Sequence, residues 1–101
     1  MPLMEREAAF MIRLCTDKAA YEAVPRRRFK VDLARLRRSL ERRGNCEITL
    51  WTPQLMIAKQ TDAIEITIVD DGRLIIRNVA DEQAARKIAE TLLPELMVSK
   101  H

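Results

Sequence analysis

The chain has 101 residues, of which 48% are hydrophobic and 33% charged, and its formal net charge at pH 7 is +3. This length and composition predict one ordered globular domain over residues 1–101 and exclude a disordered chain. No apolar run approaches the roughly 20 residues needed to span a bilayer, and residues 1–9 lack the basic and apolar regions of a secretory signal, so we expect a cytoplasmic protein without a membrane partner.

The first element in chain order is a strand over residues 8–15. Phe10, Ile12 and Leu14 point one way there, because side chains alternate between the two faces of a strand. A short helical stretch is expected next, capped by Thr16 or Asp17 and ended by Pro25.

A longer helix is predicted over residues 31–43. At 100° per residue one stripe of it is apolar, formed by Phe29, Leu33, Leu36 and Leu40. Gly44 follows the last arginine, as glycine commonly does after a helix C-terminus.

The remaining elements are four strands and a final helix. The strands are expected over residues 46–51, 55–59, 63–69 and 73–79. Asp71-Gly72 predicts a type I′ hairpin turn, in which both central residues need positive φ. Asp81 is a good N-cap for the last helix, which we expect to run to Pro94.

These elements predict a single α+β domain with a five-stranded antiparallel sheet, in the order β-α-β-β-β-β-α, and two main helices packed on one face. The expected core consists of Phe10, Ile12, Leu14, Leu33, Leu36, Leu40, Ile48, Leu50, Ile64, Ile66, Ile68, Leu74, Ile76, Ile88 and Leu92. The other sheet face is left to solvent or a partner, and is expected to carry Met11, Arg13, Glu47, Thr49, Trp51, Glu65, Thr67, Arg73, Ile75 and Arg77.

Three short stretches give this chain a family resemblance. They are Val31-Asp32-Leu33, Asp71-Gly72-Arg73-Leu74-Ile75-Ile76 and Asp81-Glu82-Gln83-Ala84-Ala85. Together with the element order, they resemble one half-repeat of the TATA-binding protein fold over nearly the whole chain. The ending is also similar to that of small uncharacterised archaeal proteins and to a C-terminal module of sulfur-carrier adenylyltransferases.

The resemblance to TATA-binding protein implies a nucleic-acid partner and a second half. That family makes its saddle from two half-repeats, and a homodimer could supply the second half here, joined edge to edge or through the open sheet face. It also kinks DNA with paired phenylalanines. The aromatic residues here are Phe10, Tyr21, Phe29 and Trp51, none of them in the hairpin that would carry such wedges, so we do not expect DNA kinking.

Charge is strongly concentrated along the chain. Residues 26–43 hold nine basic and two acidic side chains, a net charge of +7, while the rest of the chain carries −4. Guanidinium groups suit phosphate oxygens, and the candidate nucleic-acid-binding residues are Arg26, Arg27, Arg28, Arg35, Arg38 and Arg42. The alternative is a solvated helix face with local pairs, Asp32 with Arg35 and Arg37 with Glu41.

No catalytic or metal site is expected. The sequence lacks GxGxxG, GxxxxGK[ST] and HExxH, and its one histidine, His101, is terminal. Cys15 precedes the expected short helix, which could activate its thiol, but a structural thiol is the plainer interpretation for it and for Cys46. Asp70 and Asp71 are interpreted as turn formers.

The sequence therefore predicts a non-catalytic protein that has no cofactor. This protein is expected to bind nucleic acid through its basic helix. The alternative is a protein-interaction module that uses the open sheet face around Trp51, Arg73, Ile75 and Arg77. Trp51 could also be simple edge packing.

Overall fold

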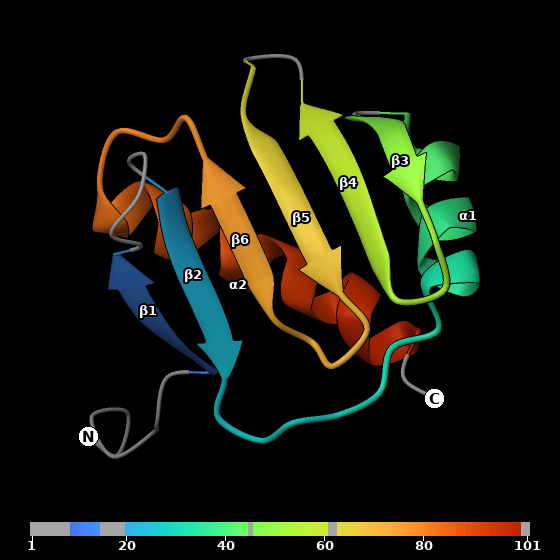
Figure 1. Cartoon of the computed structure of the whole chain (residues 1–101), viewed down its shortest axis with the longest axis horizontal. Coiled ribbons are helices and arrows are strands. Elements are labelled where there is room, and N and C mark those ends of the chain that lie inside the picture. Colours follow the sequence, from blue (N-terminus) through green and yellow to red (C-terminus); the bar gives the residue numbers. More distant parts are fainter. Residues whose placement is uncertain (1–8, 15–19, 45, 61–62, 100–101) are drawn as a thin grey trace.

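A computed structural model describes residues 9–14, 20–44, 46–60 and 63–99. Within these residues one antiparallel sheet has six strands, in the spatial order β1-β2-β6-β5-β4-β3. Figure 1 shows helices α1 and α2 behind this sheet, α2 crossing its middle and α1 beside β3. The predicted α+β class with both helices on one face is confirmed, but the predicted number of strands is wrong.

The additional strand is β2 (Ala20–Pro25), which lies between β1 (Phe10–Leu14) and β6 (Leu74–Arg77). The helical stretch predicted before Pro25 is therefore wrong where the structure describes it, at residues 20–23. The alternating positions Ala20, Glu22 and Val24 place their side chains opposite those of Tyr21, Ala23 and Pro25, and Ala23 and Pro25 are buried. Pairing with strands on both sides outweighs the weak local helix signal. Residues 15–19, with the proposed caps and Cys15, lie outside the described part.

Helix α1 (Leu33–Arg43) begins two residues later than predicted. The Asp32 side chain accepts hydrogen bonds from the backbone N–H groups of Ala34 (3.1 Å) and Arg35 (3.2 Å), which makes it the N-cap. Val31 stays outside the helix because its N–H donates to the Asp70 carbonyl at 2.8 Å. Gly44 ends the helix at φ 74°, a left-handed conformation that glycine adopts without steric cost.

Strand β3 (Cys46–Trp51) contains an irregularity that reverses one prediction. Its pairing with β4 (Leu55–Gln60) shifts between Ile48 and Leu50, as at a β-bulge. After the shift Leu50 lies opposite Ile57 and Trp51 opposite the buried Met56. Trp51 therefore faces the helices and Leu50 the open side, which is the reverse of the predicted arrangement.

The turn between β5 (Glu65–Val69) and β6 differs from the predicted type I′ turn. Gly72 has a positive φ of 93°, whereas Asp71 is not among the described residues with positive φ. The Gly72 N–H donates to the Val69 carbonyl, and the Val69 N–H donates to the Arg73 carbonyl, both at 2.9 Å. This is a three-residue loop with glycine in the left-handed position.

Helix α2 (Glu82–Val98) begins after Asp81, as predicted, but it continues through Pro94. Proline removes one backbone hydrogen bond from a helix, yet the last turn is held by tertiary contacts. Leu96 is fully buried, and the Ser99 carbonyl accepts a bond from the Asp32 N–H at 2.8 Å. The end of α2 is thus fixed against the start of α1.

The core lies between the sheet and the two helices, as predicted. It includes Leu36, Ile66, Ile76 and Ala89, each no more than 1% exposed. The prediction that two further residues belong to the core is wrong. Leu50 is 45% exposed because of the bulge, and Leu14 is 64% exposed because it ends the edge strand β1. No helix in the described part of the chain is long and apolar enough to cross a membrane.

Candidate functional site

The outer face of α1 carries three exposed arginines, Arg35, Arg38 and Arg42, which we call the arginine row. They stand at i, i+3 and i+7, so they follow one another along about 10 Å of helix. Within the described residues none of the three makes an ion pair. The row therefore presents one sign of charge to solvent.

The other two arginines of α1 are occupied. The Arg37 Nε lies 3.2 Å from the Glu41 carboxylate, as predicted, and its guanidinium lies 5.7 Å from the centre of the Trp51 ring. Arg43 donates to Glu95 on α2. The five arginines of α1 thus form two groups. Arg37 and Arg43 make contacts within the fold, and the arginine row faces solvent.

Glu95 joins the two helices at the end of α1. Its carboxylate accepts hydrogen bonds from the Ser39 hydroxyl and from Arg43. The bond from Ser39, followed by those from Arg43 and the charges of Arg43 and Arg42, lowers the pKa of Glu95. Ser39 is therefore a donor in a helix–helix contact.

Arg26, Arg27 and Arg28 lie on the connection between β2 and α1, along the lower edge of the sheet in Figure 1. They therefore precede the helix that carries the arginine row. Arg28 lies 3.8 Å from the Asp71 carboxylate, and the neighbouring Lys30 lies 3.0 Å from Asp70. These pairs hold the β2–α1 connection against the β5–β6 hairpin.

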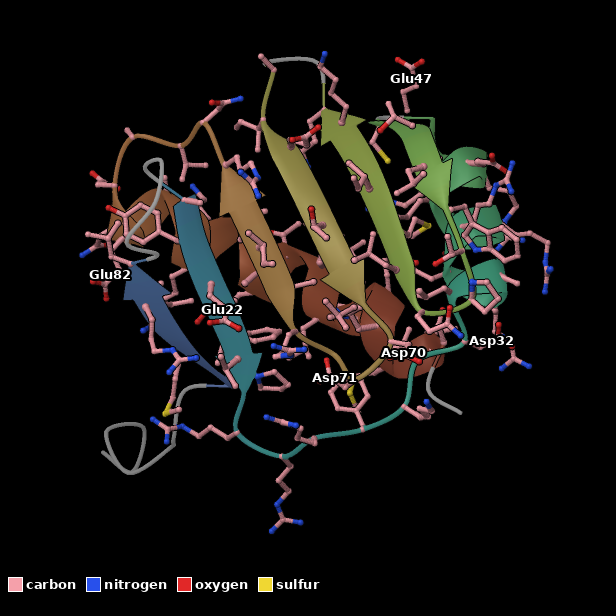
Figure 2. The ribbon with its side chains drawn as sticks, viewed as in Figure 1. Glu22, Asp32, Glu47, Asp70, Asp71 and Glu82 are labelled. Atoms are coloured by element: carbon pink, nitrogen blue, oxygen red, sulfur yellow. The ribbon has the colours of Figure 1, made fainter. Side chains whose placement is uncertain are left out.

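The two hairpin carboxylates thus have local structural roles. Asp71 also accepts a hydrogen bond from the backbone N–H of Arg73 at 3.2 Å, as a turn former does, and Figure 2 shows both aspartates at this end of the sheet.

The sheet face away from the helices, which we call the open face, is organised in cross-strand rows. Residues directly opposite one another share a face, so the pairing defines each row. The charged row consists of Glu47, Lys59, Glu65 and Arg77. The apolar row consists of Leu50, Ile57, Thr67 and Ile75.

The open face also holds Arg73 and Glu22. Arg73 Nε donates to Asp71 at 2.9 Å, and its Nη1 lies 3.4 Å from Glu22. The hydrogen bond with Asp71 is the main reason that the pKa of Arg73 is raised. Of the predicted partner-binding residues, Arg73, Ile75 and Arg77 thus lie on this side, while Trp51 lies on the other.

Three residues of these rows were missing from the predicted open face: Ile57, Lys59 and Leu50. The alternation of the 55–59 strand contains Ile57 and Lys59 as a same-face pair, and that signal could have found them. Nothing in the sequence of residues 46–51 marks the bulge that turns Leu50 outward.

A cavity of about 360 Å³ lies between the helices and the sheet. Its walls are mainly apolar, including Leu40, Ile66 and Ile88, with Lys87 and Cys46 among its polar groups. Burial, and then the charge of Glu41, raises the pKa of the Cys46 thiol. A raised pKa keeps the thiol protonated and a poor nucleophile, which supports a structural role for Cys46.

No cluster of three or more histidine, cysteine or acidic side chains that could hold a metal ion occurs among residues 9–14, 20–44, 46–60 and 63–99. Cys15 and His101 lie outside those ranges.

The chain matches no family model, no curated protein and no solved structure. The resemblances to a half-repeat of TATA-binding protein, to archaeal proteins and to the adenylyltransferase module therefore stay predictions.

Proposed function

We propose that this chain is a non-catalytic domain that binds nucleic acid through phosphate contacts of the arginine row. The observation that carries the proposal is that Arg35, Arg38 and Arg42 make no ion pair within the described residues, although two other arginines of the same helix do. An exposed guanidinium without a partner loses no existing ion pair when it binds a phosphate.

The composition of the row argues for contacts to the backbone of the nucleic acid. Arginines alone occupy it, on a helix whose outward face offers no Asn or Gln for adenine edges. Phosphate contacts position a protein without reading sequence. The proposed binding is therefore strongly salt dependent and has little base preference.

The test is binding of a labelled duplex and a labelled single strand across a salt series. Three phosphate contacts predict a slope of log affinity against log salt of about −2.7 for the duplex. The variant with Arg35, Arg38 and Arg42 changed to Gln should lose most of this affinity and slope. Binding that ignores salt, or that survives the triple change, would contradict the proposal.

Arg37→Gln and Arg38→Gln form a matched pair of controls. Both remove one charge from α1, but Arg37 is paired with Glu41 while Arg38 belongs to the arginine row. Arg38→Gln should weaken binding more than Arg37→Gln. Equal effects would mean that the net charge of the protein, and not the row, attracts the nucleic acid.

A second candidate function is a protein-interaction module that uses the open face. Within the described chain no helix covers this face, and it exposes large apolar side chains, with Leu50 45% and Met11 43% exposed. Apolar groups of this kind favour a protein partner. Because α1 lies behind the sheet, variants of the two surfaces can be tested independently.

A further inference from the structure

The signs of charge alternate along the charged row of the open face. Glu47 on β3 lies opposite Lys59 on β4, Lys59 opposite Glu65 on β5, and Glu65 opposite Arg77 on β6. Lys59 and Glu47 are exposed, and the side chains of Arg77 and Glu65 are 41% and 36% exposed, 4.0 Å apart. The row therefore reads negative, positive, negative, positive across four adjacent strands.

Such a row is complementary to itself when it is reversed. We propose that the open face binds a second copy of this chain, in a dimer whose two-fold axis runs parallel to the strands between β4 and β5. This rotation exchanges β3 with β6 and β4 with β5. It places Lys59 opposite Glu65 of the second copy and Glu47 opposite Arg77 of the second copy.

A two-fold interface must bring one surface against the same surface, so every position has to suit its symmetry mate. The apolar row satisfies this requirement under the same rotation. Leu50 meets Ile75 of the second copy, and Ile57 meets Thr67. Leu50 and Ile75 thus cover one another, Ile57 covers the largely buried Thr67, and each carboxylate of the charged row meets a cation.

A rotation axis running across the strands does not give this match. Placed at the apolar row, it would bring the charged row over the positions of Leu55 and Val69, the next row along β4 and β5. Placed at the charged row, it would set each charge against its own copy. Burying charges against apolar side chains without a partner is strongly unfavourable. The arrangement of the rows therefore selects the axis that runs along the strands.

Sheets that pack face to face cross at about 30°, which separates outer residues more than central ones. The pairs nearest the axis, Lys59 with Glu65 and Ile57 with Thr67, stay close at any crossing angle. The Lys59–Glu65 pair occurs twice in the dimer, once on each side of the axis, so it is the sharpest place for a test.

The experiment is sedimentation of the full chain over a range of concentrations, alone and as mixtures of two variants. The wild type should dimerise. Lys59→Glu should weaken self-association by at least about a hundredfold, because two carboxylates face each other at both symmetric positions. Glu65→Lys should do the same with two lysines.

An equimolar mixture of the two variants should dimerise again, because the carboxylate introduced at position 59 of one copy then meets the ammonium group introduced at position 65 of the other. At the second position the unchanged Glu65 and Lys59 meet. This recovery depends on the proposed axis, since an edge-to-edge dimer does not join these positions. Lys87→Glu makes the same charge change on α2 and should leave the dimer intact.

A wild type that stays monomeric up to millimolar concentration would overturn the proposal, and so would a mixture that fails to dimerise while each variant is folded. Circular dichroism checks folding, and Lys59→Ala with Glu65→Ala gives a milder pair if a reversal unfolds the chain. Each alanine variant should weaken self-association relative to the wild type, and unchanged dimers would also overturn the proposal.

Discussion

The arginine row and the open face carry charge in two different ways. On α1 the outward side chains without ion pairs in the described structure share one sign, whereas on the sheet the signs alternate from strand to strand. A surface of one sign repels its own copy and attracts a polyanion. A surface of alternating sign attracts any surface with the reverse order, which includes itself.

The difference follows from how each element spaces its side chains. Positions three and four apart lie on one side of a helix, so Arg35, Arg38 and Arg42 add to one another. In a sheet the nearest neighbours on one face come from adjacent strands, and opposite charges on adjacent strands stabilise the sheet. Strand pairing thus favours alternation, while a helix face can accumulate one sign.

The largest expected effect comes from shortening a buried leucine on α1, compared with an exposed leucine on the open face. Leu36 is fully buried on the inner side of α1, so Leu36→Ala should lower the free energy of unfolding by about 3 kcal/mol. Leu50 is 45% exposed on the open face, so Leu50→Ala should cost less than about 1 kcal/mol in the monomer. Urea denaturation at low protein concentration measures both. Equal losses would contradict the outward position of Leu50.

A reciprocal experiment separates the two surfaces. The triple change of Arg35, Arg38 and Arg42 to Gln should reduce duplex affinity about tenfold or more at low salt, and should leave self-association unchanged. Lys59→Glu should have the opposite pattern. Duplex titration and sedimentation of both proteins measure the two effects, and a variant that abolishes both properties would mean that binding and dimerisation share one surface.

Acid should weaken the link between the helices. The pKa of Glu95 is lowered in the folded chain, chiefly by the Ser39 hydrogen bond. Its stabilising effect is therefore present above the usual Glu pKa of about 4.3 and is lost as pH falls through the lower folded value. Glu95→Gln should cost about 1 kcal/mol at pH 7 and less in acid. Glu90→Gln on the same helix is the control and should cost less at pH 7, because Glu90 is half exposed.

The smallest expected effect concerns the Cys46 thiol inside the cavity. Its raised pKa and partial burial should make it react with a disulfide reagent at pH 8 more slowly than a peptide cysteine. The Cys15→Ser variant isolates this thiol, and the denatured protein supplies the reference rate. A faster reaction in the folded chain would show an activated thiol and would contradict a purely structural role.

Local signals predicted helix α1 and most of the second half of the fold. The Asp81 cap, the alternation in residues 64–68 and the apolar stripe of α1 each act within a few residues, so the sequence contains them completely. The strand β2 could not be found in the same way. Its stability comes from pairing with β1 and β6, and its own residues carry only a weak helical signal.

The two candidate surfaces also differ in whether local sequence or strand pairing determines them. The arginine row was predicted correctly as a set of neighbours on one helix face, because helix spacing is fixed. The charged row depends on the register of four strands, and the place of Leu50 depends on a bulge. Both properties depend on how strands pair with one another, and the sequence of a single strand does not show that pairing.

The position of β2 in the sheet has a consequence for the order in which the chain folds. Strands β3 to β6 pair with their sequence neighbours, so they can form early with short loop closures. By contrast Ala23 of β2 pairs with Leu74 of β6, about half the chain length away. We therefore expect the β1–β2 hairpin to join the β3–β6 meander late in folding. In hydrogen exchange the amides of β1 should open before those of β4 and β5.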